Sequence, residues 1–261
     1  MRTTALAFLF GLLSGALGGL MGVGGGILLV PLLVHAVHTR QHEAQGTSLV
    51  FVTAAALVAT IPYIRQGNID FGLALILMAG AVPGVLVGAA VARRMTARGL
   101  RRAFGLMIFV TAIRILAAAP NLSEGTVHLW RPPFEALLGF GVGFLGGLLG
   151  IGGGTMLVPV LVLTQHVPQH LAQGVSLLMI VPTGVVGGWS HARHGHVVRS
   201  LLPGLIAGGV LGALAGALLA HRIGSTELSR LFALFLIPVS LQMIFGRGRA
   251  TVADPATTPE S

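Results

Sequence analysis

Long apolar runs alternate with short polar segments along the whole chain. A helix needs about 20 apolar residues to cross roughly 30 Å of hydrocarbon. Runs of this length occur at 5–22, 44–64, 71–92, 100–119, 134–150, 171–190, 200–220 and 228–245. Two shorter apolar segments, 26–37 and 154–165, follow the first and the fifth run. The pattern predicts an all-α polytopic membrane protein with about eight transmembrane helices, located in the cell membrane.

Composition supports this prediction and limits the partners. Of the 261 residues, 54% are hydrophobic and only 9% are charged, and the mean hydropathy is +0.89. The net charge of +9 is carried by arginines in short loops between the apolar runs, without interleaved aromatic residues. We interpret them as determinants of membrane topology and predict no nucleic-acid partner. The chain has no cysteine, which excludes disulfides and cysteine-ligated zinc.

The sequence repeats itself at an offset of 128 residues. Segments 11–34 and 139–162 agree at 15 of 24 positions, and QHEAQGTSL at 41–49 agrees with QHLAQGVSL at 169–177 at seven of nine. Two homologous halves of this kind are a common plan of secondary transporters. We therefore divide the chain into a first transmembrane repeat (1–116), a connecting loop (117–133), a second transmembrane repeat (134–246) and a disordered polar tail (247–261).

The orientation of the halves depends on whether the first element of each half crosses the membrane. Arg114 lies within a span and is left out of the count; if all eight elements cross, eight arginines lie on one side and seven on the other. If the first element of each half enters and leaves on the same side, the halves are inverted and eleven arginines oppose four. The positive-inside rule favours the inverted repeats. The length of 5–22, which suffices to span alone, favours the other arrangement.

Each half opens with a glycine cluster, GVGGGILLVP at 22–31 and GIGGGTMLVP at 150–159. Glycine weakens a helix by about 1 kcal/mol relative to alanine, so the clusters predict a broken helix at membrane depth. A helix that restarts after the break offers free N–H groups and partial positive charge to an anion. Interrupted helices at matching positions also mark transporter binding sites. We predict a substrate site at Gly24, Gly25, Gly26, Gly152, Gly153, Gly154 and Thr155.

Polar residues at the starts of the second and sixth runs extend this candidate site. Gln45 and Ser48 match Gln173 and Ser176 across the repeat, and these uncharged groups could hold the oxygens of an anion. The alternative for each is a hydrogen bond between helices, and close helix packing is the alternative for the glycines.

Histidines are the candidates for proton coupling. His42 and His170 match across the repeat and could titrate near neutral pH. His191, His194 and His196 form an H-x-x-H-x-H cluster, but the first half has Tyr, Gln and Asn there. We interpret these three as surface histidines. We predict no catalytic residue, metal site or cofactor, because clustered intramembrane nucleophiles and metal ligands are missing.

The doubled G-x-G-G-G-x-x-x-V-P element, followed by A-Q-G-x-S at 44–48 and 172–176, resembles the TauE/SafE sulfite exporter family over about residues 5–246. The resemblance implies a secondary transporter that exports small sulfur oxoanions, such as sulfite or organosulfonates, across the bacterial cytoplasmic membrane. It implies no established set of functional residues. Proton coupling is expected because the chain has no ATP-binding segment. A passive anion channel and a non-transporting membrane scaffold are the alternatives.

Overall fold

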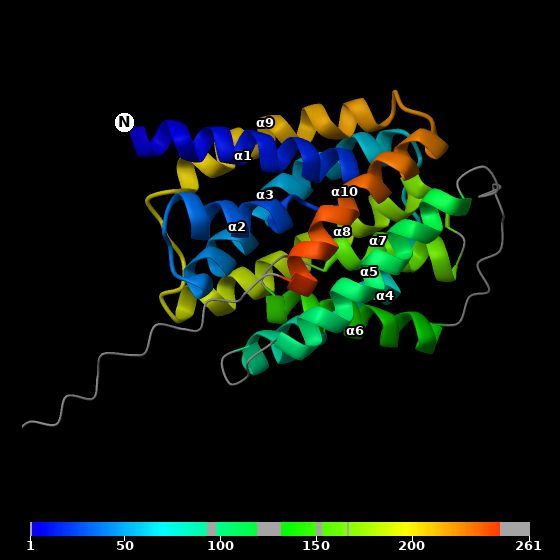
Figure 1. The fold of residues 1–261 in the computed structure, drawn as a ribbon, viewed down its shortest axis with the longest axis horizontal. Coiled ribbons are helices and arrows are strands. Elements are labelled where there is room, and N and C mark those ends of the chain that lie inside the picture. Colours follow the sequence, from blue (N-terminus) through cyan, green and yellow to red (C-terminus); the bar gives the residue numbers. More distant parts are fainter. Residues whose placement is uncertain (1, 93–97, 119–131, 150–152, 166, 246–261) are drawn as a thin grey trace, which may run out of the picture.

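The computed structural model of the chain describes residues 2–92, 98–118, 132–149, 153–165 and 167–245. All regular elements in these ranges are helices (Figure 1), which confirms the predicted all-α fold. Gly152, most of the connecting loop and the polar tail lie outside the described residues. The helices are α1 (Arg2–Met21), α2 (Gly26–Ala36), α3 (Gln41–Arg65), α4 (Phe71–Ala92), α5 (Arg98–Ala118), α6 (Pro132–Leu149), α7 (Gly154–Thr164), α8 (Gln169–Arg193), α9 (Leu202–Ala220) and α10 (Ser225–Phe245).

Each predicted apolar run corresponds to a helix, and six of the helices in the described ranges are long and apolar enough to cross a membrane. These are α1, α3, α4, α6, α8 and α9. Large apolar side chains cover the outside of the bundle, as Leu75 and Leu137 show with 66% and 68% of their surface exposed. Such a surface suits lipid and not water. The chain is therefore a multi-pass membrane protein, and the count of eight spans stays a prediction.

Two helices of 25 residues each, α3 and α8, form the centre of the bundle. Near the start of α3, Gly46 packs against His191 in the last turn of α8. Near the end of α3, Tyr63 is hydrogen-bonded to Gln173 at the start of α8. The two helices are therefore antiparallel. We call the end where α3 begins and α8 ends the His42 end, and the opposite end the Tyr63 end.

Glycine ladders join the outer helices in two parallel pairs, α1 with α9 and α4 with α6. A Cβ atom on any of these glycines would strike backbone of the facing helix, so the helices touch without an intervening side chain. In the first pair Gly11, Gly15 and Gly19 face Leu205, Gly209 and Ala213, and in the second Gly139, Gly143 and Gly147 face Leu77, Ala81 and Val85. Each contact of one pair recurs in the other at an offset of 128 residues.

The packing interlocks the two predicted repeats. Helix α1 of the first repeat lies along α9 of the second, α4 of the first lies along α6 of the second, and α5 packs against α10 (Figure 1). Inverted repeats require that matching helices run in opposite directions, and α3 and α8 do so. We keep the inverted arrangement as our interpretation of these contacts.

Candidate functional site

The chain turns sharply between α1 and α2. Gly22, Gly24 and Gly25 have φ angles of 70°, 71° and 83°, in the left-handed region that glycine adopts without strain. The backbone N–H of Gly24 bonds to the carbonyl oxygen of Gly18 at 3.3 Å, which folds the segment back along α1. Helix α2 then begins at Gly26 in the interior of the bundle, and all these glycines are buried. The predicted helix break is present here.

The second break, between α6 and α7, has a different local conformation. Gly153 precedes α7 with φ −66°, an ordinary right-handed value. A Cβ atom on Gly153 would lie 3.0 Å from Cγ1 of Val142 and 3.1 Å from Cε of Met179. The carbonyl oxygen of Val142 would lie 3.2 Å away. The packing is still less strict than at Gly25, where the Cβ atom would strike the carbonyl oxygen of Ser14. Thr155 is the second residue of α7.

Both breaks reach the same side chain, Ile180 in the middle of α8. A Cβ atom on Gly24 would lie 3.3 Å from Cδ1 of Ile180 and 3.4 Å from Cβ of Val52. A Cβ atom on Gly154, the first residue of α7, would overlap Cδ1 of Ile180. Val52 and Ile180 are completely buried in the central helices. The starts of α2 and α7 therefore meet at the centre of the antiparallel pair.

Buried polar atoms without hydrogen-bond partners surround this meeting point. In the described part of the chain they are Oγ of Ser14, Oε1 of Gln45, Nε2 of Gln173 and Oγ of Ser176. A buried polar group left unpaired costs about 1–3 kcal/mol, so four in one region need an explanation. Neither α2 nor α7 has a side-chain N-cap, and the first N–H groups of a helix have no acceptor within it. The arrangement suits a small anion that accepts hydrogen bonds.

Each of the two predicted glutamines reaches the glycine break of the other repeat. Nε2 of Gln45 donates to the carbonyl oxygen of Leu149, the last residue before the second break, at 3.1 Å. The side chain of Gln173 packs against Gly22 in the first break, and its Oε1 accepts a hydrogen bond of 3.0 Å from Tyr63. The structure therefore brings Gln45 and Gln173 to the predicted site from opposite halves.

The two predicted serines lie beside the short helices of their own halves. Oγ of Ser48 is 3.5 Å from the carbonyl oxygen of Gly26, a contact at the limit of a hydrogen bond. Oγ of Ser176 would lie 2.6 Å from a Cβ atom on Gly154. Both serines are completely buried. Gln45 is 7% exposed and Gln173 is completely buried, so all four predicted polar residues of the two helix starts lie in the protein interior.

Four residues of this region were not predicted as site residues: Ser14, Val52, Tyr63 and Ile180. Tyr63 did carry a signal, because it is the only tyrosine of the chain and matches His191 at the offset of 128 residues. Val52 and Ile180 also match each other, but an aliphatic residue in an apolar span does not stand out. Ser14 is one small polar residue in a glycine-rich helix and gives no sequence signal.

At the His42 end, four histidines come together. The ring centroid of His196 lies 5.4 Å from that of His42, 5.9 Å from that of His191 and 6.2 Å from that of His194. His191 is only 5% exposed, so the interpretation of the H-x-x-H-x-H residues as surface histidines is wrong for His191. Within the described residues, no three His, Cys, Asp or Glu side chains are arranged to hold a metal ion.

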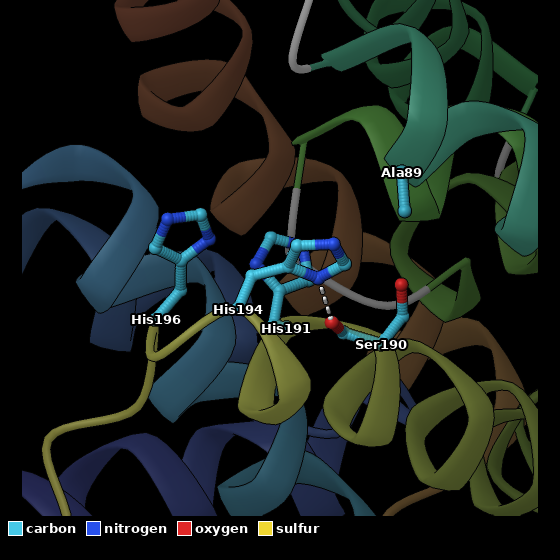
Figure 2. A pocket seen from close by; sticks show the side chains of 5 residues that line it. All are labelled: Ala89, Ser190, His191, His194 and His196. Atoms are coloured by element: carbon cyan, nitrogen blue, oxygen red, sulfur yellow. Dashed lines mark hydrogen bonds between the residues drawn. The ribbon is translucent and has the colours of Figure 1, made fainter.

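A small pocket lies at this cluster. Figure 2 shows that His191, His194 and His196 line it together with Ser190 and Ala89. Nδ1 of His194 is 2.6 Å from the carbonyl oxygen of Ser190. Because Ala89 belongs to the last turns of α4, the pocket also places the end of α4 at the His42 end.

His170, which was paired with His42 in the sequence, lies at the Tyr63 end instead. Its Nε2 is 3.1 Å from the carbonyl oxygen of Ala220, and its ring centroid is 5.6 Å from that of His221. The ring of His221 in turn meets Tyr63 edge-on at 4.4 Å. Burial is the main cause that lowers the pKa of His221, and the charge of His170 adds to it, while a hydrogen bond to Ala217 opposes it.

Comparison with known proteins decides the family. The family model described as "Sulfite exporter TauE/SafE" matches residues 6–243. The chain belongs to the TauE/SafE family. It is 32% identical over 241 residues to a probable membrane transporter protein of Xylella fastidiosa strain 9a5c, covering 90% of this chain and 92% of the relative.

A second relative of the chain comes from Bacillus subtilis strain 168. The probable membrane transporter protein YunE is 27% identical over 259 residues, covering 90% of this chain and 95% of YunE. The family and these relatives are described as membrane transporters and not as enzymes. No solved structure matches the chain.

Proposed function

We propose that this TauE/SafE protein is a secondary transporter that exports small sulfur oxoanions, such as sulfite or an organosulfonate, with protons as the coupling ion. The observation that carries the proposal is the meeting of the starts of α2 and α7 at Ile180. Among the residues whose burial is described, no arginine is buried, and two helix N-termini that converge in such an interior are suited to a small anion.

In the proposed complex, the anion displaces the Ile180 side chain from between the two breaks. Backbone N–H groups in the first turns of α2 and α7 then donate to its oxygens. The hydroxyl of Ser176 and the amide of Gln173 supply further donors, since Oγ of the former and Nε2 of the latter are buried without partners in the described part of the chain. Uncharged donors hold an anion without neutralising it, which favours release after transport.

Opening of the site is proposed to occur between α3 and α8. The glycine ladders leave no room between α1 and α9 or between α4 and α6, so each pair is expected to move as one unit. The contacts between α3 and α8 differ at their two ends. Tyr63 bonds to Gln173 at one end, and the histidines pack together at the other. Parting one end at a time would give alternating access.

The His42 end is assigned to the cytoplasm. Arg40 and Arg199 lie next to α3 and after α8 at this end, and Arg93 and Arg94 follow in the sequence directly after α4, which ends here. The inverted repeats place eleven arginines on this side and four on the other, as the positive-inside rule requires. The Tyr63 end then faces the cell exterior or periplasm.

Flux measurements in proteoliposomes test the proposal. Purified protein is reconstituted, and transport of labelled sulfite, sulfate, thiosulfate and sulfoacetate is followed with and without an imposed pH gradient. We expect saturable flux of sulfite or sulfoacetate that the pH gradient stimulates. Saturable flux that does not change when the pH gradient is imposed would contradict proton coupling. Non-saturable flux would indicate a passive channel. Absence of flux with folded protein would favour the scaffold.

A further inference from the structure

Four histidines, His42, His191, His194 and His196, cluster at the His42 end, and the proposed anion site does not use them. They come from three places in the sequence: His42 from the first turn of α3, His191 from the last turn of α8, and His194 and His196 from the turn that follows. His196 is the central member, within 6.2 Å of each of the others by ring centroid (Figure 2 shows three of them). Imidazole is the side chain that changes charge between about pH 5 and 8.

The turn after α8 that carries His194 and His196, called the histidine turn below, is in direct contact with α3 beside the candidate anion site. A Cβ atom on Gly46 would strike the carbonyl oxygen of His196 and lie 2.9 Å from Cβ of His191. The N–H of Val198 also donates to Oγ1 of Thr47 at 2.9 Å. Gln45, the residue that precedes Gly46 on α3, bonds to Leu149 at the second glycine break. A movement of the histidine turn therefore acts directly on the helix segment that holds Gln45.

The corresponding contact at the other end has a different chemistry. There Gly174 packs against the carbonyl oxygen of Asn68, and Tyr63 stands where the His42 end has His191. The Tyr63 hydroxyl stays neutral across the physiological range because a phenol titrates near pH 10. The Tyr63 end also carries two histidines, His170 and His221, whose ring centroids lie 5.6 Å apart. Among the described residues, the His42 end differs by gathering four imidazoles around the contact between α8 and α3.

We propose that His42, His191, His194 and His196 bind the coupling proton, and that protonation of this cluster opens the His42 end to the anion. The inference rests on the proposed transport function. Because a doubly charged oxoanion that leaves with one proton still carries net negative charge outward, the inside-negative membrane potential drives this export against the proton gradient. Imidazolium rings this close repel one another and attract an oxoanion, so protonation loosens the turn and draws the substrate in. Loss of the proton restores packing of the turn against α3 and closes the end.

The surrounding charges are compatible with this role. On α3, Glu43 lies next to His42, and its carboxylate accepts a hydrogen bond of 3.0 Å from the backbone N–H of Arg40. After α8, Arg199 is exposed, and the guanidinium of Arg193 lies 4.6 Å over the ring of Trp189. The part of α4 that lines the pocket contributes Ala89, which has no charge. The arginines by themselves disfavour the imidazolium form, so the cluster is expected to take up its proton together with the anion, whose negative charge offsets both.

The test compares His196→Gln with His35→Gln. Gln keeps hydrogen-bonding capacity but does not titrate near neutral pH, and the contact with Gly46 is made by the backbone of His196. His35 is exposed and lies on α2, where its Nδ1 meets the carbonyl oxygen of Pro31 at 2.9 Å. Sulfoacetate is the probe, because its charge is constant between pH 6 and 8, whereas sulfite itself titrates there. Anion flux and proton flux into proteoliposomes are recorded together.

We expect wild type and His35→Gln to move protons with sulfoacetate and to lose at least about fivefold in rate between pH 6 and 8, as an imidazole-controlled step would. His196→Gln should lose most of the anion flux at pH 6 together with the proton flux, and its residual anion flux should no longer depend on pH. If His196→Gln and His42→Gln both retain the wild-type profile and proton flux, the cluster is not the coupling site.

Binding calorimetry tests the same inference in variants that fold but do not transport, because it measures proton binding without requiring flux. Proton uptake on sulfoacetate binding is obtained from titrations in buffers of different ionisation enthalpy. Wild type should take up close to one proton per anion and His196→Gln clearly less, whereas equal uptake overturns the inference. Folded wild-type protein that neither binds nor moves any tested anion would instead contradict the proposed transport function, and the inference would fall with it.

Discussion

The hydroxyl of Tyr63 donates a hydrogen bond of 3.0 Å to Oε1 of Gln173, joining the last turn of α3 to the start of α8. Both residues are completely buried, and Nε2 of the same glutamine has no partner among the described residues. The hydrogen bond to Oε1 therefore closes one end of the interface between α3 and α8. The Nε2 group of the same side chain stays available to a ligand.

Tyr63→Phe removes this hydrogen bond, together with the 3.2 Å contact of the same hydroxyl with the carbonyl oxygen of Gly19, and leaves Oε1 of Gln173 unpaired. We expect a loss of about 1–3 kcal/mol of stability, measured as a lower melting temperature of the purified protein in detergent. Thr60→Val is the matched control, because Oγ1 of Thr60 donates only to the carbonyl oxygen of Ala56 within α3. Equal melting temperatures for the two variants would show that the tyrosine hydroxyl does not stabilise the interface.

The glycine ladders predict a contrast within one helix. Gly143 of α6 has no space for a side chain, because a Cβ atom would strike the carbonyl oxygen of Ala81 in α4, whereas a Cβ atom on Gly141 would meet nothing within 4 Å. We expect Gly143→Ala to lose about 1–3 kcal/mol through overpacking. Gly141→Ala should be neutral or gain up to about 1 kcal/mol in helix propensity. Thermal unfolding of both variants measures the difference, and similar melting temperatures would contradict the ladder.

The two glycine breaks should respond differently to alanine. Gly25 has φ 83° and faces the carbonyl oxygen of Ser14, so Gly25→Ala adds backbone strain to a clash. Gly153 has φ −66° and meets the side chains of Val142 and Met179, which can move. We expect Gly25→Ala to reduce the yield of folded protein much more than Gly153→Ala. Fluorescence-detected gel filtration of tagged variants measures the folded fraction, and the reverse order would contradict the different local conformations.

The lowered pKa of His221 predicts a pH dependence of stability. A free histidine has a pKa of about 6.5, and burial beyond the end of α9 lowers the value in the folded protein. The unfolded chain therefore binds the proton more readily, so stability falls as the pH drops below about 6.5 and this contribution vanishes above about pH 7.5. The melting temperature should rise from pH 5 to 7.5, and less steeply in His221→Asn. An unchanged slope in His221→Asn, with His35→Asn as control, would contradict the assignment.

Inverted repeats predict that matching positions lie on opposite sides of the membrane. Gln66 follows α3 and Ser200 lies beyond the end of α8, the matching helix, and both are exposed. Because the chain has no cysteine, Gln66→Cys and Ser200→Cys each introduce one label site. We expect an impermeant thiol reagent added outside intact cells to label Gln66→Cys and not Ser200→Cys. Labelling of both from the same side would contradict the inverted arrangement.

The sequence was sufficient to locate the helices because apolar length directly reflects membrane thickness. The short segments expected at 26–37 and 154–165 became α2 at Gly26–Ala36 and α7 at Gly154–Thr164. The central helices were expected at 44–64 and 171–190 and are longer, since backbone hydrogen bonds continue through polar residues such as Gln41 and His191. Hydrophobicity therefore marked the apolar core of each helix but not its ends.

The tertiary partners could not be read from the sequence. Glycine spacing indicated that α1 and α6 pack closely against something, but not that α1 meets α9 and α6 meets α4, because any small-residue stripe could have been the partner. His42 was likewise matched to His170 by position in the repeat, while the antiparallel packing of α3 and α8 places it beside His196. Matching positions in two antiparallel helices lie at opposite ends, so internal homology alone pairs the wrong side chains.

The most direct test of the account is the affinity of the purified protein for sulfite and sulfoacetate in wild type, Ser176→Ala and Ser240→Ala. Both serines are completely buried, but Oγ of Ser240 donates to Ile237 within α10, whereas Oγ of Ser176 lies unpartnered beside Gly154. Calorimetry should show that Ser176→Ala weakens binding by about five- to tenfold, the value of one hydrogen bond, and that Ser240→Ala binds like wild type. Equal affinities in all three proteins would contradict a binding site where the two glycine breaks meet.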